Sequence, residues 1–158
     1  MTTLQKTRTK VFLEFQNIII MENGNMKWFE QAIGKEKIIH MFNGNIDVNE
    51  IYLHKILCYD YRLTILFHIL NIPPVFPNKW NDKDFNAISM QLSFSDVSCI
   101  NIYGNNLFNK MGTLNINVDE NVVKMSLKGD EINIICESNF YFIDNITPEF
   151  INIEESTN

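Results

Sequence analysis

Apolar and polar residues alternate along much of this chain, and this alternation predicts strands. The clearest case is ISMQLSF at residues 88–94, in which every second residue is apolar. A two-residue period is typical of a strand with one face on a core. Shorter runs with the same period are separated by polar turns, and they predict an antiparallel meander in the second half of the chain; they lie at residues 114–118, 123–127, 132–136 and 140–143.

Residues 50–60 and 61–71 are both rich in β-branched and aromatic residues, and Asp60-Tyr61 lies where a tight reversal would fall. This pattern predicts a hairpin. The expected cross-strand pairs are Cys58–Leu63, Ile56–Ile65, His54–Phe67 and Tyr52–Ile69 on one face, and Leu57–Thr64, Lys55–Leu66 and Leu53–His68 on the other. Since both faces are largely apolar, we expect the hairpin to be covered on both sides, by a helix on one and by another layer or a partner on the other.

Helical spacing of apolar residues begins at Trp28 and continues to Phe42, with an interruption at Gly34. Gly44 follows where the C-terminus of a helix favours a left-handed residue. We therefore predict one helix with a break over residues 28–42. The expected fold class is α+β, with this N-terminal helix packed on a mostly antiparallel β-sheet meander.

Three prolines in residues 72–77 predict a corner, because proline lacks an amide donor and no strand or helix can run through such a segment. Trp80 follows at once and is large enough to anchor the corner to the core. We assign structural roles to Trp28, Pro77 and Trp80. The apolar phase shifts at Ser95-Asp96, which predicts a bend or bulge within one strand, and residues 146–148 are expected to end the sheet.

Residues 1–25 are expected to be an N-terminal extension or the product of a mis-assigned start. Their apolar run is broken by Glu14, Gln16 and Asn17, so it does not fit the core of a secretion signal. Met26 stands just ahead of the first organised pattern. The predicted domain organisation is therefore an extension at 1–25 and a single domain at 26–158.

Charge and cysteine content narrow the classes of partner. The net charge is −6, and nucleic-acid binding depends on clustered Lys and Arg, so we expect no nucleic-acid partner. The same charge would favour a basic protein partner, although mild acidity is also common among soluble cytosolic proteins and by itself identifies no partner. The longest apolar runs are shorter than the ~18 residues of a membrane helix. Cys58, Cys99 and Cys136 lie in strand patterns, which predicts three buried free thiols and a reducing, cytoplasmic setting.

No catalytic or cofactor site is expected. His40, His54 and His68 form no metal-binding signature, and Cys58 and Cys99 lie in strands rather than at activated helix starts. No phosphate-binding glycine loop or nucleophile elbow occurs. Adjacent carboxylates at Asp82 and Asp84, or at Asp119 and Glu120, are more typical of solvated turns than of a hydrolase.

Four short motifs follow one another in a layout typical of a known family: Trp28, Ile33-Gly34, the Pro77-Asn78-Lys79-Trp80 corner and the strand NAISMQLSF at 86–94. With this layout the chain resembles, over roughly residues 26–150, immunity protein family 50 of bacterial polymorphic-toxin systems. It implies an α+β domain, mostly β, that binds and neutralises a cognate toxin without catalysis. One alternative is a structural β-module, or one that holds a small apolar ligand between sheet and helix, with no toxin partner. A third is a degenerate enzyme.

The family supplies no contact motif, so candidate toxin contacts come from the residues themselves. Acidic side chains in polar connections are exposed and free to meet a basic partner. The candidates are Asp82, Asp84, Asp119, Glu120, Asp130 and Glu131. The competing interpretation is that these residues only form turns and keep the protein soluble.

Overall fold

The computed structural model describes residues 27–106 and 109–152. The chain divides into two compact units, residues 1–30 and residues 31–158. The described part of the first unit is residues 27–30, where the rings of Trp28 and Phe29 meet edge to face with centroids 5.5 Å apart. The expected extension, residues 1–25, lies outside the described residues.

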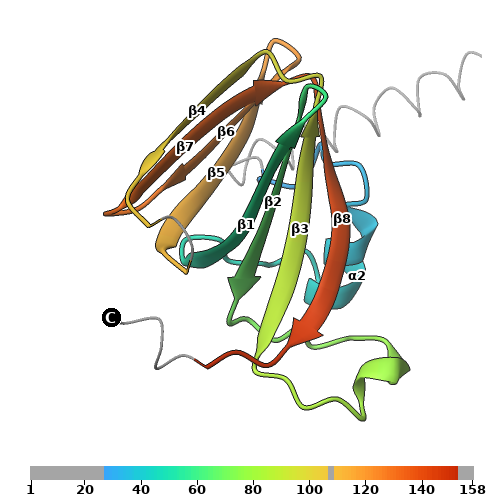
Figure 1. Ribbon diagram of the computed structural model, residues 1–158. Coiled ribbons are helices and arrows are strands. Elements are labelled where there is room, and N and C mark those ends of the chain that lie inside the picture. The colour runs from blue at the N-terminus through green and yellow to red at the C-terminus, as the bar shows by residue number, and fades with distance from the viewer. Residues whose placement is uncertain (1–26, 107–108, 153–158) are drawn as a thin grey trace, which may run out of the picture. The chain divides into compact units, whose positions relative to one another are not determined.

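In the larger unit, the described residues form one eight-stranded sheet with the order β4-β7-β6-β5-β1-β2-β3-β8 (Figure 1). All pairs of neighbouring strands are antiparallel. The predicted α+β class therefore fits roughly, with far more sheet than helix. The strands are β1 (Ile51–Tyr59), β2 (Arg62–Ile69), β3 (Ala87–Ser95), β4 (Cys99–Gly104), β5 (Met111–Asp119), β6 (Val122–Lys128), β7 (Ile132–Ser138) and β8 (Phe140–Glu149).

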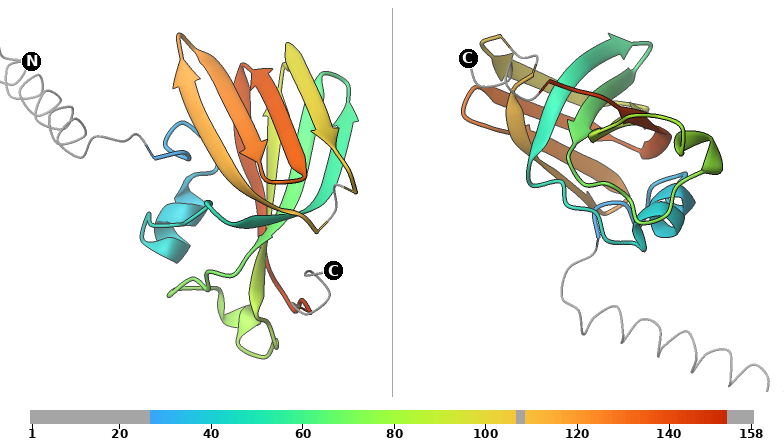
Figure 2. Two further views of the ribbon diagram at one scale, coloured as in Figure 1. Left: turned by 90° about the vertical axis from the view of Figure 1, so that its left-hand side faces the viewer. Right: turned by 90° about the horizontal axis from the view of Figure 1, so that it is seen from below.

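The sheet folds into two layers, because β1 and β5 pair only at their first residues. The two pairs are Ile51 with Gly112 and Tyr52 with Met111. Beyond them the layer β4-β7-β6-β5 lies across the layer β1-β2-β3-β8 (Figure 2). The alternating apolar residues of both layers are buried, and they form the core: Leu63, Ile65, Phe67, Ile69, Ile88, Met90, Leu92, Phe94, Leu114, Ile116, Val123, Met125, Leu127, Ile132, Ile134 and Cys136.

The β1–β2 hairpin is confirmed, and Asp60 and Tyr61 both have the positive φ of a tight two-residue turn. Four expected pairs near this turn are correct. The three farther from it are wrong, because a bulge at His54 shifts the register, so that Leu53 pairs with Phe67 and Tyr52 with His68. The bulge brings Leu53 onto the core face, where it is fully buried.

The predicted helix is much shorter than expected. Helix α2 covers only Glu36–Phe42, and residues 28–31 form a turn. Ile33 forms a parallel bridge with Phe142. Gly34 has a φ of 91°, and a Cβ there would lie 2.7 Å from the carbonyl oxygen of Ile143, so this position must leave the helical region and stay free of a side chain. Gly44 has the expected positive φ.

The proline corner is confirmed, since residues 72–77 lie outside every helix and strand. A 3₁₀ helix, η1 (Asn78–Trp80), follows it. Trp80 is 3% exposed, its ring stacks on that of Phe76 at 5.8 Å, and it meets the ring of Phe85 edge to face. The rings of Phe76 and Phe85 also meet edge to face, with centroids 5.6 Å apart, so the corner has its own cluster of three mutually contacting rings.

Two expected strand boundaries are wrong. The chain does not bend at Ser95-Asp96 and continue the same strand; it leaves β3 and crosses to the other layer, where β4 pairs with β7. Residues 146–148 do not end the sheet, because β8 continues to Glu149, with Pro148 opposite Ile88. Strand β8 is at the end of the sheet order, and an edge strand tolerates a proline.

Candidate functional site

The six acidic candidates are all exposed, and they lie in three separate loops or, for Asp119, at the strand end that leads into one. Asp82 and Asp84 follow η1. Asp119 and Glu120 lie at the β5–β6 turn, whereas Asp130 and Glu131 lie at the β6–β7 turn at the opposite end of β6, about 20 Å away for a strand of this length. The structure does not bring the three loops together, so at most one or two of them belong to a single compact contact area.

The β5–β6 turn carries a structural constraint as well as charge. Glu120 and Asn121 both have positive φ, as a two-residue hairpin turn requires. The neighbouring Asp119 forms an exposed ion pair with Lys124 at 3.4 Å. Exposed pairs of this kind contribute little stability.

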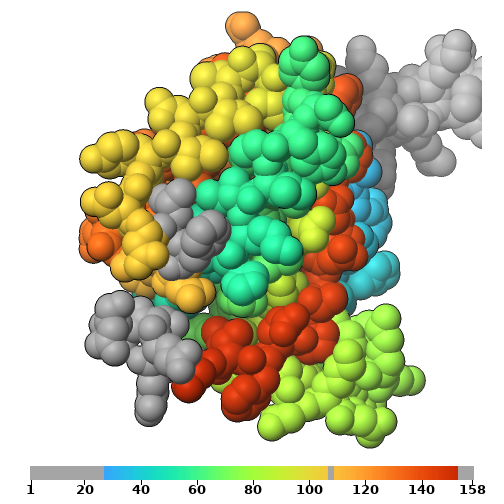
Figure 3. Space-filling view, viewed as in Figure 1, coloured from blue at the N-terminus to red at the C-terminus, as the bar shows by residue number. Residues whose placement is uncertain are grey.

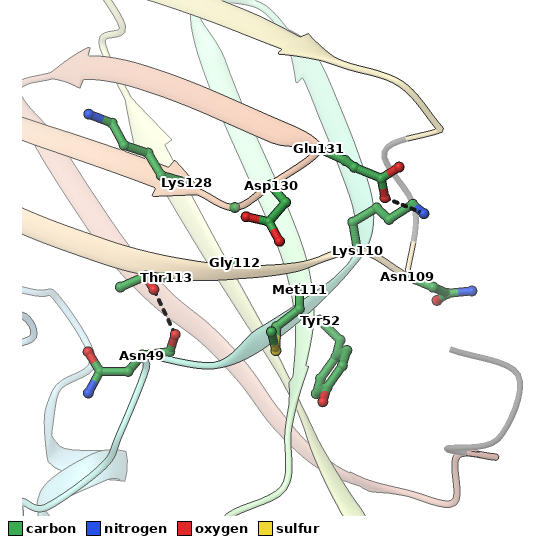
Figure 4. A pocket seen from close by; sticks show the side chains of 11 residues that line it. Asn49, Tyr52, Asn109, Lys110, Met111, Gly112, Thr113, Lys128, Asp130 and Glu131 are labelled. Carbon is green, nitrogen blue, oxygen red and sulfur yellow. Dashed lines mark hydrogen bonds and ion pairs between the residues drawn. The ribbon is translucent and has the colours of Figure 1, made fainter. Parts of the chain in front are cut away.

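The β6–β7 turn borders a pocket of about 600 Å³ beside the first residues of β1 and β5 (Figure 4). Its lining is mostly polar and includes both signs of charge. The lining residues are Asn49, Tyr52, Asn109, Lys110, Met111, Gly112, Thr113, Lys128, Gly129, Asp130 and Glu131.

Some of the charged side chains of this pocket form an ion pair, and others do not. Lys110 Nζ lies 2.5 Å from Glu131 Oε2, and the lysine side chain is the more buried of the two, at 24% against 51% exposure. Among the described residues, the Asp130 carboxylate has no hydrogen bond or ion pair; Figure 4 shows it between Lys128 and Lys110. The pocket can therefore accept a cationic group at Asp130 without breaking an existing pair.

A second polar site lies on the outer face of the β1-β2-β3-β8 layer, and the sequence patterns did not indicate it. The Asp144 carboxylate accepts hydrogen bonds from Ser93 Oγ and, at 3.2 Å, from Gln91 Nε2. The Ser93 and Thr64 hydroxyls lie 2.9 Å apart in the same network. Asp144 is an extra residue in β8 where the register with β3 shifts, so no periodicity in the sequence marks it.

His54 and His68 also meet on this face, with ring centroids 5.1 Å apart. Burial lowers the pKa of His68 from 6.5, the nearby His54 lowers it further, and Glu149 acts in the opposite direction. The bulge at His54 creates this contact, which is why the spacing of the two histidines in the sequence did not reveal it. The described part of the chain contains no group of three or more His, Cys, Asp or Glu side chains placed to hold a metal ion.

The cysteines differ from the expectation that all three are buried. Cys136 is buried in β7, whereas Cys58 and Cys99 are exposed, and all three are free thiols. Burial, followed by the neighbouring Cys99, Cys58 and Glu137, raises the pKa of Cys136 to about 12. Cys58 is exposed because the far end of β1 has no partner on its β5 side, which a strand pattern alone does not show.

No helix among the described residues has the length and apolar character needed to cross a membrane. No curated protein matches the chain. No solved structure matches it either. The family model of immunity protein 50, however, matches residues 34–149, which is well over half of the chain and includes all eight strands, the proline corner and the acidic loops. The chain therefore belongs to the immunity protein 50 family.

Proposed function

We propose that this protein binds a cognate bacterial toxin in the cytoplasm and neutralises it as a stoichiometric, non-catalytic partner. Membership of the immunity protein 50 family is the observation that carries the proposal. An inhibitor of this kind acts by binding, so it requires shape, charge and exposed contact residues rather than a catalytic group.

Charge supports a basic partner. The chain carries a net charge of −6, and six of its acidic side chains stand exposed in loops at the ends of strands. Such charges raise the rate at which an oppositely charged protein is captured. We propose Asp82, Asp84, Asp119, Glu120, Asp130 and Glu131 as candidate contacts, and Asp130 is the best placed because it borders a pocket and has no ion pair with a described residue.

The alternative, a module for a small apolar ligand, receives less support from the pocket. Ligand pockets are lined predominantly by hydrophobic and aromatic side chains. The pocket at the β6–β7 turn is instead lined mostly by polar and charged groups, with Tyr52 and Met111 as its larger apolar side chains. That lining favours a polar or charged group such as a side chain of a protein partner.

Co-expression tests the proposal. The genes beside this one are searched for a toxin domain, which is then expressed in a sensitive bacterial host, with and without this protein, and growth is measured. We expect rescue, together with a one-to-one complex of the purified proteins in size-exclusion chromatography. Growth arrest despite soluble expression, with no complex, would show that the protein does not neutralise that toxin.

A further inference from the structure

Strand β4 (Cys99–Gly104) has one unpaired edge. It lies at the end of the sheet order, and among the described residues its only ladder is with β7. That ladder has six residue pairs with no register shift. An unpaired edge of this length offers a row of backbone donors and acceptors to another strand.

The direction of the backbone groups identifies which residues face this edge. The amide of Asn105 donates to the carbonyl oxygen of Glu131 at 3.3 Å, across the β4–β7 ribbon. Because residues of an antiparallel strand alternate in the side to which their N–H and C=O groups point, those of Ile100, Ile102 and Gly104 face outward. Three consecutive outward positions are enough for a short strand to pair.

Nothing in the sequence of β4 protects this edge. Natural edge strands are usually blunted by lysine, proline, a bulge or an inward-pointing charge. The strand CINIYG has none of these, and Ile100, Ile102 and Tyr103 are 40%, 37% and 75% exposed. The free end of β1 lies beside it (Figures 2 and 3). The β3–β4 connection is joined to the β1–β2 turn by a hydrogen bond from the Val97 amide to the Tyr61 carbonyl.

Charge at the ends of β4 indicates the occupant. Residues 96–106 and 129–138 contain Asp96, Asp130, Glu131 and Glu137 but no Lys or Arg. Lys110 pairs with Glu131, and Lys124 is the cross-strand neighbour of Glu137. Asp96 before β4 and Asp130 beside its end form no ion pair among the described residues; Asp130 lies between Lys128 and Lys110, and Lys110 is already paired with Glu131 (Figure 4).

These two carboxylates disfavour a second copy of this chain. If two copies paired antiparallel along β4, the Asp96 end of one would meet the Asp130 end of the other, so like charges would face each other at both ends. An apolar segment with basic residues at its flanks would meet a carboxylate at each end instead. The edge is therefore complementary to a basic partner rather than to itself.

We propose that an extended segment of the toxin, with alternating apolar residues between basic flanks, adds to β4 as a further strand. This inference rests on the proposed function and specifies the surface that performs it. Main-chain hydrogen bonds to Ile100, Ile102 and Gly104 would supply affinity, while contacts with the apolar side chains and the two end carboxylates would supply specificity.

The test uses Ile102→Pro in the full chain, with Ile102→Val as the matched control. Proline removes an outward N–H that β7 does not use, so the β4–β7 ladder is preserved, whereas valine keeps both the donor and the apolar character. The probe is the purified toxin domain encoded beside this gene. We expect Ile102→Pro to weaken binding by roughly tenfold or more, with little change for Ile102→Val and with both melting temperatures near wild type.

Amide hydrogen exchange on the unaltered protein provides a second measurement that does not depend on a variant folding. The amides of Ile100, Ile102 and Gly104 should become protected when the toxin domain is added. The β4 inference would be overturned, and the proposed function left intact, by the following result. The wild type binds the toxin and rescues cells without protection of these amides, and Ile102→Pro binds as tightly as the wild type. Failure of the wild type to bind or rescue would overturn both. Protection in the free protein that grows with its concentration would identify a second copy as the occupant.

Discussion

Gly129 lies directly against the backbone of Met111: a Cβ built on Gly129 would stand 2.1 Å from the Met111 carbonyl oxygen. The same Cβ would lie 3.3 Å from the Cα of Gly112. The β6–β7 turn therefore packs on the start of β5 with no room for a side chain, and this close approach forms one wall of the pocket that Asp130 borders.

Gly129→Ala should accordingly destabilise the fold. The obstructing atom belongs to the backbone, so it cannot move aside as the end of a flexible side chain would, and overpacking typically costs about 1–3 kcal/mol. Urea unfolding at equilibrium measures the loss. The control is Asp130→Ala, the next residue, which is exposed and should stay within about 0.5 kcal/mol of wild type. Equal stability of the two variants would contradict the close contact.

Trp80→Ala should cost about 3–5 kcal/mol, because it removes the buried ring that packs against both Phe76 and Phe85. The amide of Trp80 also donates to the carbonyl oxygen of Pro77 at 2.9 Å, so the two residues fix the corner together. Lys79→Ala, at an exposed neighbouring position, is the control. A wild-type melting temperature for Trp80→Ala, accompanied by lost toxin binding, would move Trp80 from the fold to the interface.

The strands and the first hairpin could be predicted because their signals are local. Alternation over 88–94 and turn residues at Asp60-Tyr61 identify their elements without reference to the rest of the chain. The wrong predictions concern segments whose structure depends on contacts with residues far away in the sequence. The apolar residues before Gly34 satisfy helical spacing, yet Ile33 pairs with Phe142, more than a hundred residues away. Similarly, β4 does not continue β3 as one bent strand, because β4 pairs with β7 in the other layer.

In the candidate site, too, local features could be predicted from the sequence and features that depend on distant segments could not. Exposure of the six acidic residues was predictable from their polar connections, and the structure agrees. The pocket beside Asp130 could not be predicted from the sequence, since it depends on the close approach of Gly129 to Met111. The contact between His54 and His68 was not predictable either, because it depends on a bulge that shifts the register by one residue and thereby exchanges the two faces of the strand.

Removal of residues 1–25 tests the predicted domain organisation. A chain that starts at Met26 should have the same melting temperature as the full chain and should rescue toxin-expressing cells equally well, because the family match covers residues 34–149. Differential scanning calorimetry and the growth assay measure these two properties. Unfolding of the shortened chain would show that residues 11–20 are an integral part of the fold.

The pH dependence of stability should report the burial of His68. Its pKa is lowered from 6.5 in the folded protein, so the unfolded chain binds the proton more readily. Between the folded pKa and 6.5, the unfolded state therefore holds more protons, and the free energy of unfolding rises with pH across that window. Stability is complete above 6.5 and declines as the pH falls through the window.

His68→Gln should remove this decline, since glutamine has no charged form to desolvate. Urea unfolding of the variant, repeated at intervals from about pH 7.5 to about pH 5.5, should give a flatter profile than wild type. His40→Gln is the control, because His40 is exposed on α2 and lies away from the His54–His68 contact. If His40→Gln flattens the profile and His68→Gln does not, the assignment to His68 is wrong.

Charge reversal in two of the acidic loops should slow capture of the toxin. Asp82→Lys combined with Asp130→Lys changes exposed carboxylates that have no ion pair in the described structure, so the fold should be retained. Stopped-flow or surface plasmon resonance should show a larger fall in the association rate than rise in the dissociation rate. The effect should shrink as salt shortens the Debye length from about 10 Å at 0.1 M towards about 3 Å at 1 M.

The control is Asp82→Glu combined with Asp130→Glu, which keeps the charge and should associate with the toxin at the wild-type rate. Lost affinity that is independent of salt and confined to dissociation would instead place these residues in direct, desolvated contact.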